Sequence, residues 1–351
     1  MVELRWTARC RLVVPAAVVC LLTAACQSPP ASRVETPSPA PTLSQSFAAC
    51  GSLQARVRTA APGSVIDLSG CRVTGGATID KPLTIRGGQV EAEAGSFGIL
   101  VSSSNVNLDG VSVIGQQAAA YVSDEIGIRV EGTIASPVRN VVLRDCTVSN
   151  LGYGGIYIQY ADGFALERNT ITDGVYAGIM ILSGQNGSIS GNTVLRIGVR
   201  GSDANGGNAY GIALSRGTGD VSESPPTSAV TVSANTVEDV PTWHAFDGHG
   251  VAGVTWQANT ARGSRFGFFI TGSLSTGGML RALDNNVVGN TVLAPAQDAG
   301  YAIVSVYSTG GAVRDNTTSG WTPGHELLTT SAGDPNATAV GLAVSGNQAQ
   351  P

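Results

Sequence analysis

The feature of this sequence that most limits its fold is a degenerate repeat of about 23–24 residues. Each copy contains the pattern apolar-x-x-Asn-Thr-apolar or a close variant of it. The asparagines of the pattern are Asn169, Asn192, Asn235, Asn259 and Asn316, with less regular copies at Asn290 and Asn347, and Cys146 takes the Asn place in one copy. One coil of a solenoid per repeat, with insertions where the spacing is longer, accounts for this pattern.

A strand is predicted in each copy, at a fixed offset before the asparagine. The clearest examples are Gly155-Ile-Tyr-Ile, Gly178-Ile-Met-Ile, Gly211-Ile-Ala-Leu and Gly267-Phe-Phe-Ile. Apolar side chains alternate there with variable ones, which is the period of two that marks a strand. The 46 glycines and the low charged fraction of 13% favour short strands and tight turns. We expect an all-β solenoid in which stacked asparagines bond to one another at a turn.

Residues 1–25 have the pattern of an export signal. Arg5, Arg9 and Arg11 precede an almost wholly apolar stretch from Leu12 to Ala25. That stretch is shorter than the roughly 20 residues that a spanning helix needs, which favours a signal peptide over a retained helix. We therefore expect the protein to be exported to the cell envelope or the extracellular space.

The end of this signal resembles a bacterial lipobox, in Leu22-Thr23-Ala24-Ala25-Cys26. The resemblance implies that Cys26 is lipidated and anchors the protein to a membrane. Residues 26–46 are rich in proline and serine and cannot build a core, so we interpret them as an extended linker that holds residues 47–351 off that membrane. The alternative is a disordered leader after simple secretion.

Charge and cysteines add two further expectations. The formal net charge is −5, and loss of the signal would bring it to about −7, which argues against nucleic acid as a partner. A polyanionic glycan would need a locally basic groove. A disulfide between Cys50 and Cys71 would close a loop over the N-terminal end of the domain, where an open solenoid needs a cap. Cys146 is expected to be a buried repeat residue.

Two of the three histidines lie in the short segment Trp243-His244-Ala245-Phe246-Asp247-Gly248-His249. Alignment with the other copies turns Phe246 and Gly248 inward. Asp247 and His249 then project outward from one face, one strand period apart. A carboxylate and an imidazole at that separation suit proton transfer on a bound substrate.

The neighbouring copies add aromatic and basic side chains to this face. Tyr210 and Phe266 align with His244, Phe269 with Asp247, Arg216 with Gly250, and Arg265 with Trp243. We expect a groove in which aromatic rings contact sugars and arginines bind a carboxylate or sulfate. The expected substrate-binding residues are Tyr210, Arg216, Trp243, Arg265, Phe266 and Phe269. Insertions at 199–209 and 217–228 would wall this groove.

Two family resemblances follow from these residues. From Cys50 to Asn347 the repeat resembles the pectin-lyase-like superfamily, which implies a single-stranded, right-handed parallel β-helix. The segment around Asp247 resembles the Tyr-Gly-Phe-Asp-Pro-His motif of mannuronan C5-epimerases, with Phe246, Asp247 and His249 at matching positions. That second resemblance implies that Asp247 faces a uronate carboxylate and that His249 is the base, while His244 stands where the family has tyrosine.

Two functions remain open at this stage. The first is a lyase or epimerase of a uronate-containing polysaccharide that uses Asp247, His249 and His244. The second is a non-catalytic surface protein that binds glycan or a wall component. Hydrolysis needs a second carboxylate, and none aligns beside Asp247 unless Asp203 or Asp220 reaches in from the insertions.

Simpler and rarer interpretations of the same segment exist. The histidines could be ladder or turn residues, with Asp247 solvated. A zinc site from His244, Asp247 and His249 has no fourth ligand in view, so no metal or cofactor is expected, and a calcium requirement is left open. His325 lies far along the chain and is expected to be peripheral.

Overall fold

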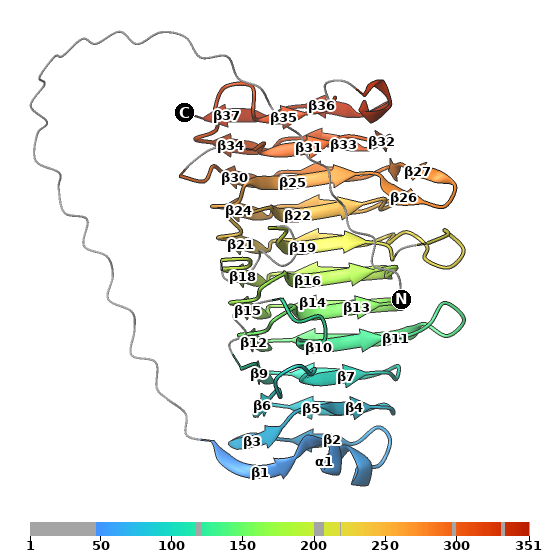
Figure 1. The fold of residues 1–351 in the computed structure, drawn as a ribbon, viewed down its shortest axis with the longest axis vertical. Coiled ribbons are helices and arrows are strands. Elements are labelled where there is room, and N and C mark those ends of the chain that lie inside the picture. Colours follow the sequence, from blue (N-terminus) through green and yellow to red (C-terminus); the bar gives the residue numbers. More distant parts are fainter. Residues whose placement is uncertain are drawn as a thin grey trace, which may run out of the picture. The chain divides into compact units, whose positions relative to one another are not determined.

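The computed structural model describes residues 47–116, 121–199, 207–217, 219–296, 300–330 and 334–350. These residues form a coil of stacked turns that runs from helix α1 (Leu53–Thr59) at one end to the last strands at the other (Figure 1). The predicted signal, the linker and the lipidation site at Cys26 lie outside the described residues, so they stay predictions. Within the described ranges, no helix is long and apolar enough to cross a bilayer.

Three parallel sheets run along the coil, because like strands of successive turns pair with one another. In the described residues the first sheet has twelve strands, in the order β1 (Ala48–Ser52), β3 (Cys71–Thr74), β6 (Gln89–Glu91), β9 (Ser112–Ile114), β12 (Thr147–Ser149), β15 (Thr170–Thr172), β18 (Thr193–Leu195), β21 (Thr236–Glu238), β24 (Thr260–Arg262), β30 (Thr291–Leu293), β34 (Thr317–Ser319) and β37 (Gln348–Gln350). The second sheet contains β2 (Val65–Asp67), β5 (Thr84–Arg86), β8 (Asn107–Asp109), β11 (Val138–Arg144), β14 (Ala161–Glu167), β17 (Gln185–Ser190), β20 (Thr231–Ser233), β23 (Thr255–Gln257), β29 (Asn286–Val288), β33 (Ala312–Arg314) and β36 (Ala343–Ser345).

The third sheet carries the candidate site. Its order is β4 (Ala77–Ile79), β7 (Ile99–Val101), β10 (Ile126–Glu131), β13 (Gly154–Gln159), β16 (Ala177–Leu182), β19 (Tyr210–Ser215), β22 (His244–His249), β25 (Phe266–Thr271), β31 (Ile303–Ser305) and β35 (Leu327–Leu328). Smaller elements are the antiparallel hairpin β26–β27, the pair β28–β32 and the short 3-10 helix η2, at Ser273–Ser275, Gly278–Leu280, Ala282–Leu283, Ser308–Thr309 and Pro335–Ala337. The parallel β-helix predicted from the repeat is confirmed.

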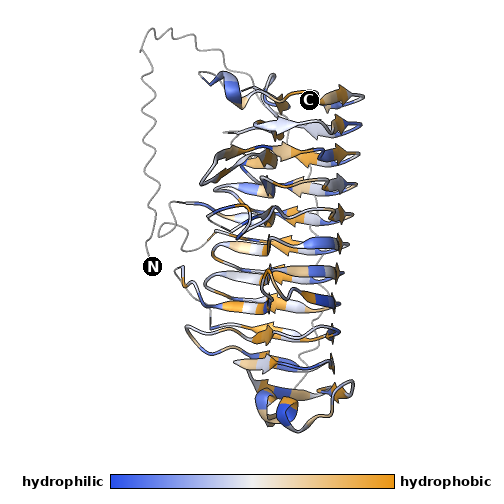
Figure 2. Ribbon diagram, turned by 90° about the vertical axis from the view of Figure 1, so that its right-hand side faces the viewer, coloured by the Kyte–Doolittle hydropathy of each residue, from blue (hydrophilic) through white to orange (hydrophobic). Residues whose placement is uncertain are grey.

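The core is a stack of apolar side chains in the interior of the coil. In the third sheet, Ile156, Ile179, Ile212, Phe246 and Phe268 occupy one register position on successive strands, and all are fully buried. Figure 2 shows that apolar and polar residues share the turns of the coil. Each strand therefore gives one set of side chains to the core and leaves the other set available for the outer wall.

The repeat asparagines form the ladder predicted from their spacing. The Asn169 side-chain amide donates to the Asn192 carbonyl oxygen at 2.9 Å, and Asn192 donates in the same way to Asn235 at 2.8 Å. The same bonding continues through Asn259, Asn290, Asn316 and Asn347. Each amide also donates to a backbone carbonyl of the preceding coil, as Asn235 does to Ile189. From Asn169 to Asn347, the ladder thus joins the same turn of successive described coils.

The N-terminal end contains the cysteine pair considered above. A disulfide joins Cys50 and Cys71, and α1 buries Leu53 and Val57 in the core. The assignment of this end as a cap for the solenoid stays a prediction. Cys146 is a buried free thiol, and burial raises its pKa to about 12. It occupies the ladder position before Asn169, whose side-chain oxygen accepts from its backbone N–H.

Candidate active site

Strand β22 brings His244, Asp247 and His249 to the outer face of the third sheet. Phe246 pairs in register with Ile212 and Phe268, and Asp247 pairs with Ala213 and Phe269. Strict alternation is interrupted, because the neighbours Ala245 and Phe246 both belong to the buried core. This interruption lets His244 and Asp247 share the outer face although they are separated by an odd number of residues.

Asp247 lies between the two histidines and bonds to both. Its Oδ1 is 2.5 Å from His244 Nδ1, and its Oδ2 is 2.6 Å from His249 Nδ1. An ionised carboxylate can only accept hydrogen bonds, so both Nδ1 atoms carry protons and donate. The Asp247 side chain is only 2% exposed. It is therefore not available to face a substrate carboxylate in this arrangement, unlike the role implied by the epimerase resemblance.

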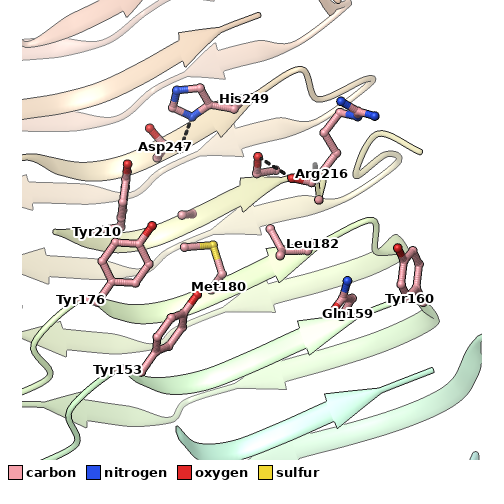
Figure 3. Close-up of a pocket in the computed structure, with 13 residues that line it drawn as sticks. Tyr153, Gln159, Tyr160, Tyr176, Met180, Leu182, Tyr210, Arg216, Asp247 and His249 are labelled. Carbon is pink, nitrogen blue, oxygen red and sulfur yellow. Dashed lines mark hydrogen bonds and ion pairs between the residues drawn. The ribbon is translucent and has the colours of Figure 1, made fainter. Parts of the chain in front are cut away.

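The two imidazoles differ in their access to solvent. The His249 side chain is 32% exposed, and its Nε2 lies on the side of the ring away from Asp247 (Figure 3). The His244 side chain is 1% exposed, and its Nε2 has no hydrogen-bond partner among the described residues. His249 thus offers a ring nitrogen to a ligand, whereas His244 reaches the groove only through Asp247.

Aromatic rings enclose His244. It stacks on Phe269 at 4.1 Å and on Trp243 at 4.8 Å between ring centroids. Tyr210 and Phe266 meet it edge-on at 5.6 and 5.1 Å. Such packing excludes water from the imidazole and fixes its orientation toward Asp247.

Burial and charge set opposite protonation tendencies in this cluster. Burial lowers the pKa of His244 to about 4, despite the opposing effect of Asp247, so this ring is neutral. Burial alone would raise the pKa of Asp247, but the charge of His249 and the bonds from both rings outweigh it and lower that pKa. Burial would also lower the pKa of His249, yet the Asp247 charge and hydrogen bond raise it above its ordinary value.

A groove of about 500 Å³ lies beside this cluster and crosses several coils. His249 and Asp247 lie at one end of it, and Tyr210, Tyr176 and Tyr153 follow one another along one side (Figure 3). Its remaining lining residues are Gln159, Tyr160, Met180, Leu182, Ala213, Ser215, Arg216 and Gly217. Four of the residues expected at the site from the sequence, Tyr210, Arg216, Asp247 and His249, thus line a single groove.

Arg216 lines the groove but is engaged by backbone groups. Its Nε donates to the Ser224 carbonyl at 2.7 Å, and its two terminal nitrogens donate to Leu274 and Gly219 at 2.9 Å each. Arg216 is 4% exposed. The guanidinium therefore joins the loop after β19 to the hairpin β26–β27, instead of lying free to bind a ligand carboxylate as the sequence analysis expected.

Four other expected substrate-binding residues surround His244 and are absent from the lining of the described groove. Trp243, Phe266 and Phe269 form the aromatic enclosure, and the Arg265 guanidinium lies over the Trp243 ring at 5.2 Å. These residues act on the site through His244 and Asp247. The structure brings these four residues together with the cluster, where they pack around it instead of lining the groove.

The carboxylates considered for hydrolysis do not join Asp247. Asp220 accepts from the Ser222 backbone and hydroxyl, and its second oxygen accepts from Thr276, so it holds the loop to the hairpin. Asp203 lies outside the described residues. In the described part of the chain, no group of three or more His, Cys, Asp or Glu side chains is arranged to hold a metal ion.

Sequence reasoning missed Tyr153, Tyr176 and the hairpin. Tyr153 and Tyr176 each stand three residues before a core isoleucine, Ile156 or Ile179, and this shared offset was a usable signal. The hairpin fills the long spacing between Asn259 and Asn290, which marked an insertion that was not assigned to the wall.

Comparison with known proteins supports the architecture. The family described as right handed beta helix region matches residues 63–317. A search of the curated proteins found no match. Similar solved structures include lacto-N-biosidase from Eubacterium ramulus, with a TM-score of 0.55, 12% identity, and coverage of 82% of this chain and 51% of that chain. The chain thus spans about half the length of that enzyme.

Two further structures are matched over almost their full length. Alginate lyase from Paenibacillus sp. str. FPU-7 has a TM-score of 0.52 and 16% identity, with coverage of 86% of this chain and 97% of that chain. Polygalacturonase from Erwinia carotovora ssp. carotovora has a TM-score of 0.50 and 12% identity, with coverage of 87% and 95%. At these identities the likeness is one of fold.

Proposed function

This chain belongs to the right-handed β-helix family, of pectin-lyase-like architecture, and from that premise we propose that it acts on a polysaccharide bound in the groove beside His249. The similar structures include enzymes whose names denote carbohydrate substrates, which supports this substrate class. The observation that carries the proposal is the bonding of Asp247 to both histidines, with His249 partly exposed at the end of the groove.

The reaction that we propose is proton abstraction from C5 of a uronate by His249 Nε2. Asp247 holds the Nδ1 proton of His249, which leaves Nε2 free to accept when the ring is neutral. In elimination, the C5–H electron pair forms the C4–C5 double bond, the C4–O4 bond breaks, and the imidazolium passes its proton to the departing oxygen. In epimerisation, C5 receives a proton from a water molecule on its opposite face, and the imidazolium releases the abstracted proton to solvent. Asp247 and His244 are positioning residues in both versions.

A second candidate function is glycan binding without turnover. It is favoured by the engagement of the Arg216 guanidinium with three carbonyls, since a uronate enzyme needs positive charge to neutralise the carboxylate as C5 loses its proton. The rings of Tyr153, Tyr176 and Tyr210 would hold sugars in either case.

Turnover by wild type and His249→Ala separates these candidates. The protein is offered a panel of polyuronates, and unsaturated sugar is followed by ultraviolet absorbance while C5 inversion is followed by proton NMR. We expect wild-type turnover and a loss of about 100-fold or more in His249→Ala, because general base catalysis contributes at least that much. His325→Ala, a histidine variant outside the groove, is the control. Glycan binding with no turnover of any polymer would contradict the catalytic proposal and support the binding function.

We also propose that the domain works at a cell surface, held by a lipid on Cys26 through the linker of residues 26–46. Metabolic labelling with a radioactive fatty acid tests this anchor. We expect label in the wild-type chain and none in Cys26→Ser. Equal labelling of the two chains would contradict lipidation at this residue.

A further inference from the structure

The groove contains a row of phenol rings that crosses three successive coils. We define the tyrosine row as Tyr153, Tyr176 and Tyr210. The ring centroids of Tyr153 and Tyr176 are 4.9 Å apart, and those of Tyr176 and Tyr210 are 5.3 Å apart. Neighbouring strands of a sheet lie about 4.8 Å apart, so each coil contributes one ring. The row leads along the coil axis to the cluster at His249 (Figure 3).

The tyrosine row is uncharged. Burial raises the pKa values of Tyr153 and Tyr210 well above the ordinary value of a phenol. The floor beside the row is made by Met180, Leu182 and Ala213, which carry no charge either. Apolar ring faces with neutral hydroxyl groups suit sugar rings, because a sugar presents C–H faces and hydroxyls.

Positive charge is almost lacking in the described lining of the groove. Arg216 is the one arginine or lysine there, and its guanidinium is already bonded to Ser224, Leu274 and Gly219. Next to the groove, Arg129 pairs with Glu131 at 3.0 Å. A carboxylate placed over the tyrosine row would lose water without gaining a cation, and such desolvation is costly.

The end of the groove is different, because His249 carries positive charge more readily than an ordinary histidine. Its imidazole faces the Asp247 carboxylate, which raises its pKa, and it is the partly exposed member of the cluster. The cationic form of His249 could therefore receive one carboxylate as the glycan binds, and the ring would act as base only after losing its Nε2 proton. A run of carboxylates could not be met along the row.

We infer that the glycan is a heteropolysaccharide, in which neutral sugars lie on the tyrosine row and one uronate lies at His249. This inference rests on the proposed function for the identity of the unit at His249. It names the substrate class more narrowly, because a homopolymer of uronates would place carboxylates against Tyr153 and Tyr176, where the nearby cation, Arg129, is already paired with Glu131.

Three hexasaccharides of matched length test this inference by isothermal titration calorimetry with the full chain. They are a hexamer of galacturonate, a hexamer of glucose, and a mixed hexamer in which five glucose units carry one terminal glucuronate. We expect the mixed hexamer to bind at least tenfold more tightly than the galacturonate hexamer, with little dependence on salt between 50 and 300 mM, about the range over which screening of exposed charges changes most. Equal or tighter binding of the galacturonate hexamer, or no binding of any hexamer, would overturn the inference.

Two variants assign the effect to the tyrosine row. Tyr176→Ala should weaken binding of the mixed and glucose hexamers about tenfold, as expected for loss of one stacked aromatic ring. Tyr301→Ala, which removes a ring packed against His325 away from the groove, is the matched control and should bind as wild type does. Unchanged affinity in Tyr176→Ala would show that the row does not hold the glycan.

The same ligands separate this inference from the proposed function. Preferred binding of the mixed hexamer without turnover would uphold the substrate class and reject the catalytic proposal. Turnover of the galacturonate polymer, lost in His249→Ala, combined with weak binding of the mixed hexamer would do the reverse.

Discussion

The asparagine ladder and the histidine cluster are two solutions to the same problem of placing polar side chains on stacked coils. In the ladder every coil from Asn169 onward supplies the same amide, and each amide satisfies the next. In the cluster one coil supplies Asp247, while the coils on either side place Ala213 and Phe269 at that register position. The repeated asparagines satisfy one another's hydrogen bonds, whereas the cluster that occurs on one coil leaves Nε2 of His249 available to a ligand.

The difference shows which polar side chains stabilise the coil and which remain available to a ligand. A ladder amide has its donors and acceptor paired within the protein, so it offers nothing to a ligand. The Asp247 carboxylate is also paired at both oxygens, but its partner His249 keeps Nε2 on a partly exposed ring. The ladder asparagines therefore stabilise the coil, whereas the polar side chains on the outer face of β22 can bind a ligand or react with it.

The largest expected effect comes from removing a central ladder amide. Asn235→Ala would leave three buried polar groups without this partner: the backbone N–H and the side-chain amide of Asn192, and the carbonyl of Ile189. Asn259 Oδ1 would keep the bond from the backbone N–H of residue 235. At about 1–3 kcal/mol for each such group, partly offset by relaxation, we expect a loss of about 4 kcal/mol in the free energy of unfolding. Chemical denaturation measures this change.

The end of the ladder provides the control for that variant. Asn347 is exposed and has no described rung beyond it, although it bonds to Asn316 and Val313. Asn347→Ala should therefore cost about 1 kcal/mol, since water can replace the lost partner. Equal losses for the central and terminal variants would mean that burial does not decide the strength of the ladder.

Much of the ladder and its register could be predicted from the sequence, because each repeat carries the same pattern and stacking places like above like. The alignment of Tyr210 and Phe266 with His244 is present as expected. The bond from His244 to Asp247 could not be predicted, since strict alternation would not place both on one face. It depends on the local interruption at Ala245 and Phe246.

The position of Arg216 was unpredictable for a different reason. Its three acceptors include the carbonyl of Leu274, which is far away in the sequence and belongs to a hairpin that lies outside the repeat. Contacts between insertions have no periodicity to reveal them. The repeat therefore predicted the strand face that carries the site, but not the contacts that join its insertions.

The next effect tests whether Asp247 sets the state of His249. In Asp247→Asn the amide has one acceptor and one donor group, so one imidazole must give up its Nδ1 proton or its bond. A His249 ring protonated on Nε2 cannot serve as base there, and we expect turnover to fall about 100-fold, or about 2.7 kcal/mol in activation free energy. The fall should exceed any change in substrate affinity.

The pH profile of this variant should shift in a direction that a merely structural role of Asp247 would not produce. Asp247 raises the pKa of His249, so wild-type turnover that needs the neutral ring should rise with pH through a midpoint above 6.5. Without the carboxylate charge, burial remains and lowers that pKa, so the midpoint should move to lower pH. NMR titration of the histidine rings measures it, and a midpoint that moves upward or stays in place would contradict this coupling.

A smaller effect is expected where Arg216 joins the two insertions. Arg216→Lys keeps the charge but replaces a planar fork with a single ammonium group, which cannot reach all three carbonyls. We expect a loss of about 2 kcal/mol in the stability of this wall and faster proteolytic cleavage in residues 219–228. Arg314→Lys, at an exposed ion pair with Asp315, is the control and should be nearly neutral.

The smallest effect concerns the backbone of the ladder turn. The residue before each ladder asparagine has a positive φ, and Gly191 and Gly289 fill this place without strain, whereas Ala258 holds it at φ +52°. Ala258→Gly should therefore stabilise the protein by about 1 kcal/mol, because a left-handed conformation costs alanine more than glycine. Ala312→Gly, in strand β33, should instead destabilise it by about 0.5–1 kcal/mol, since glycine loses more conformational freedom on folding and relieves no strain there. Thermal unfolding of the two variants measures the opposite signs. If both destabilise, the asparagine amide alone holds the turn, and the backbone conformation before it contributes no strain for glycine to relieve.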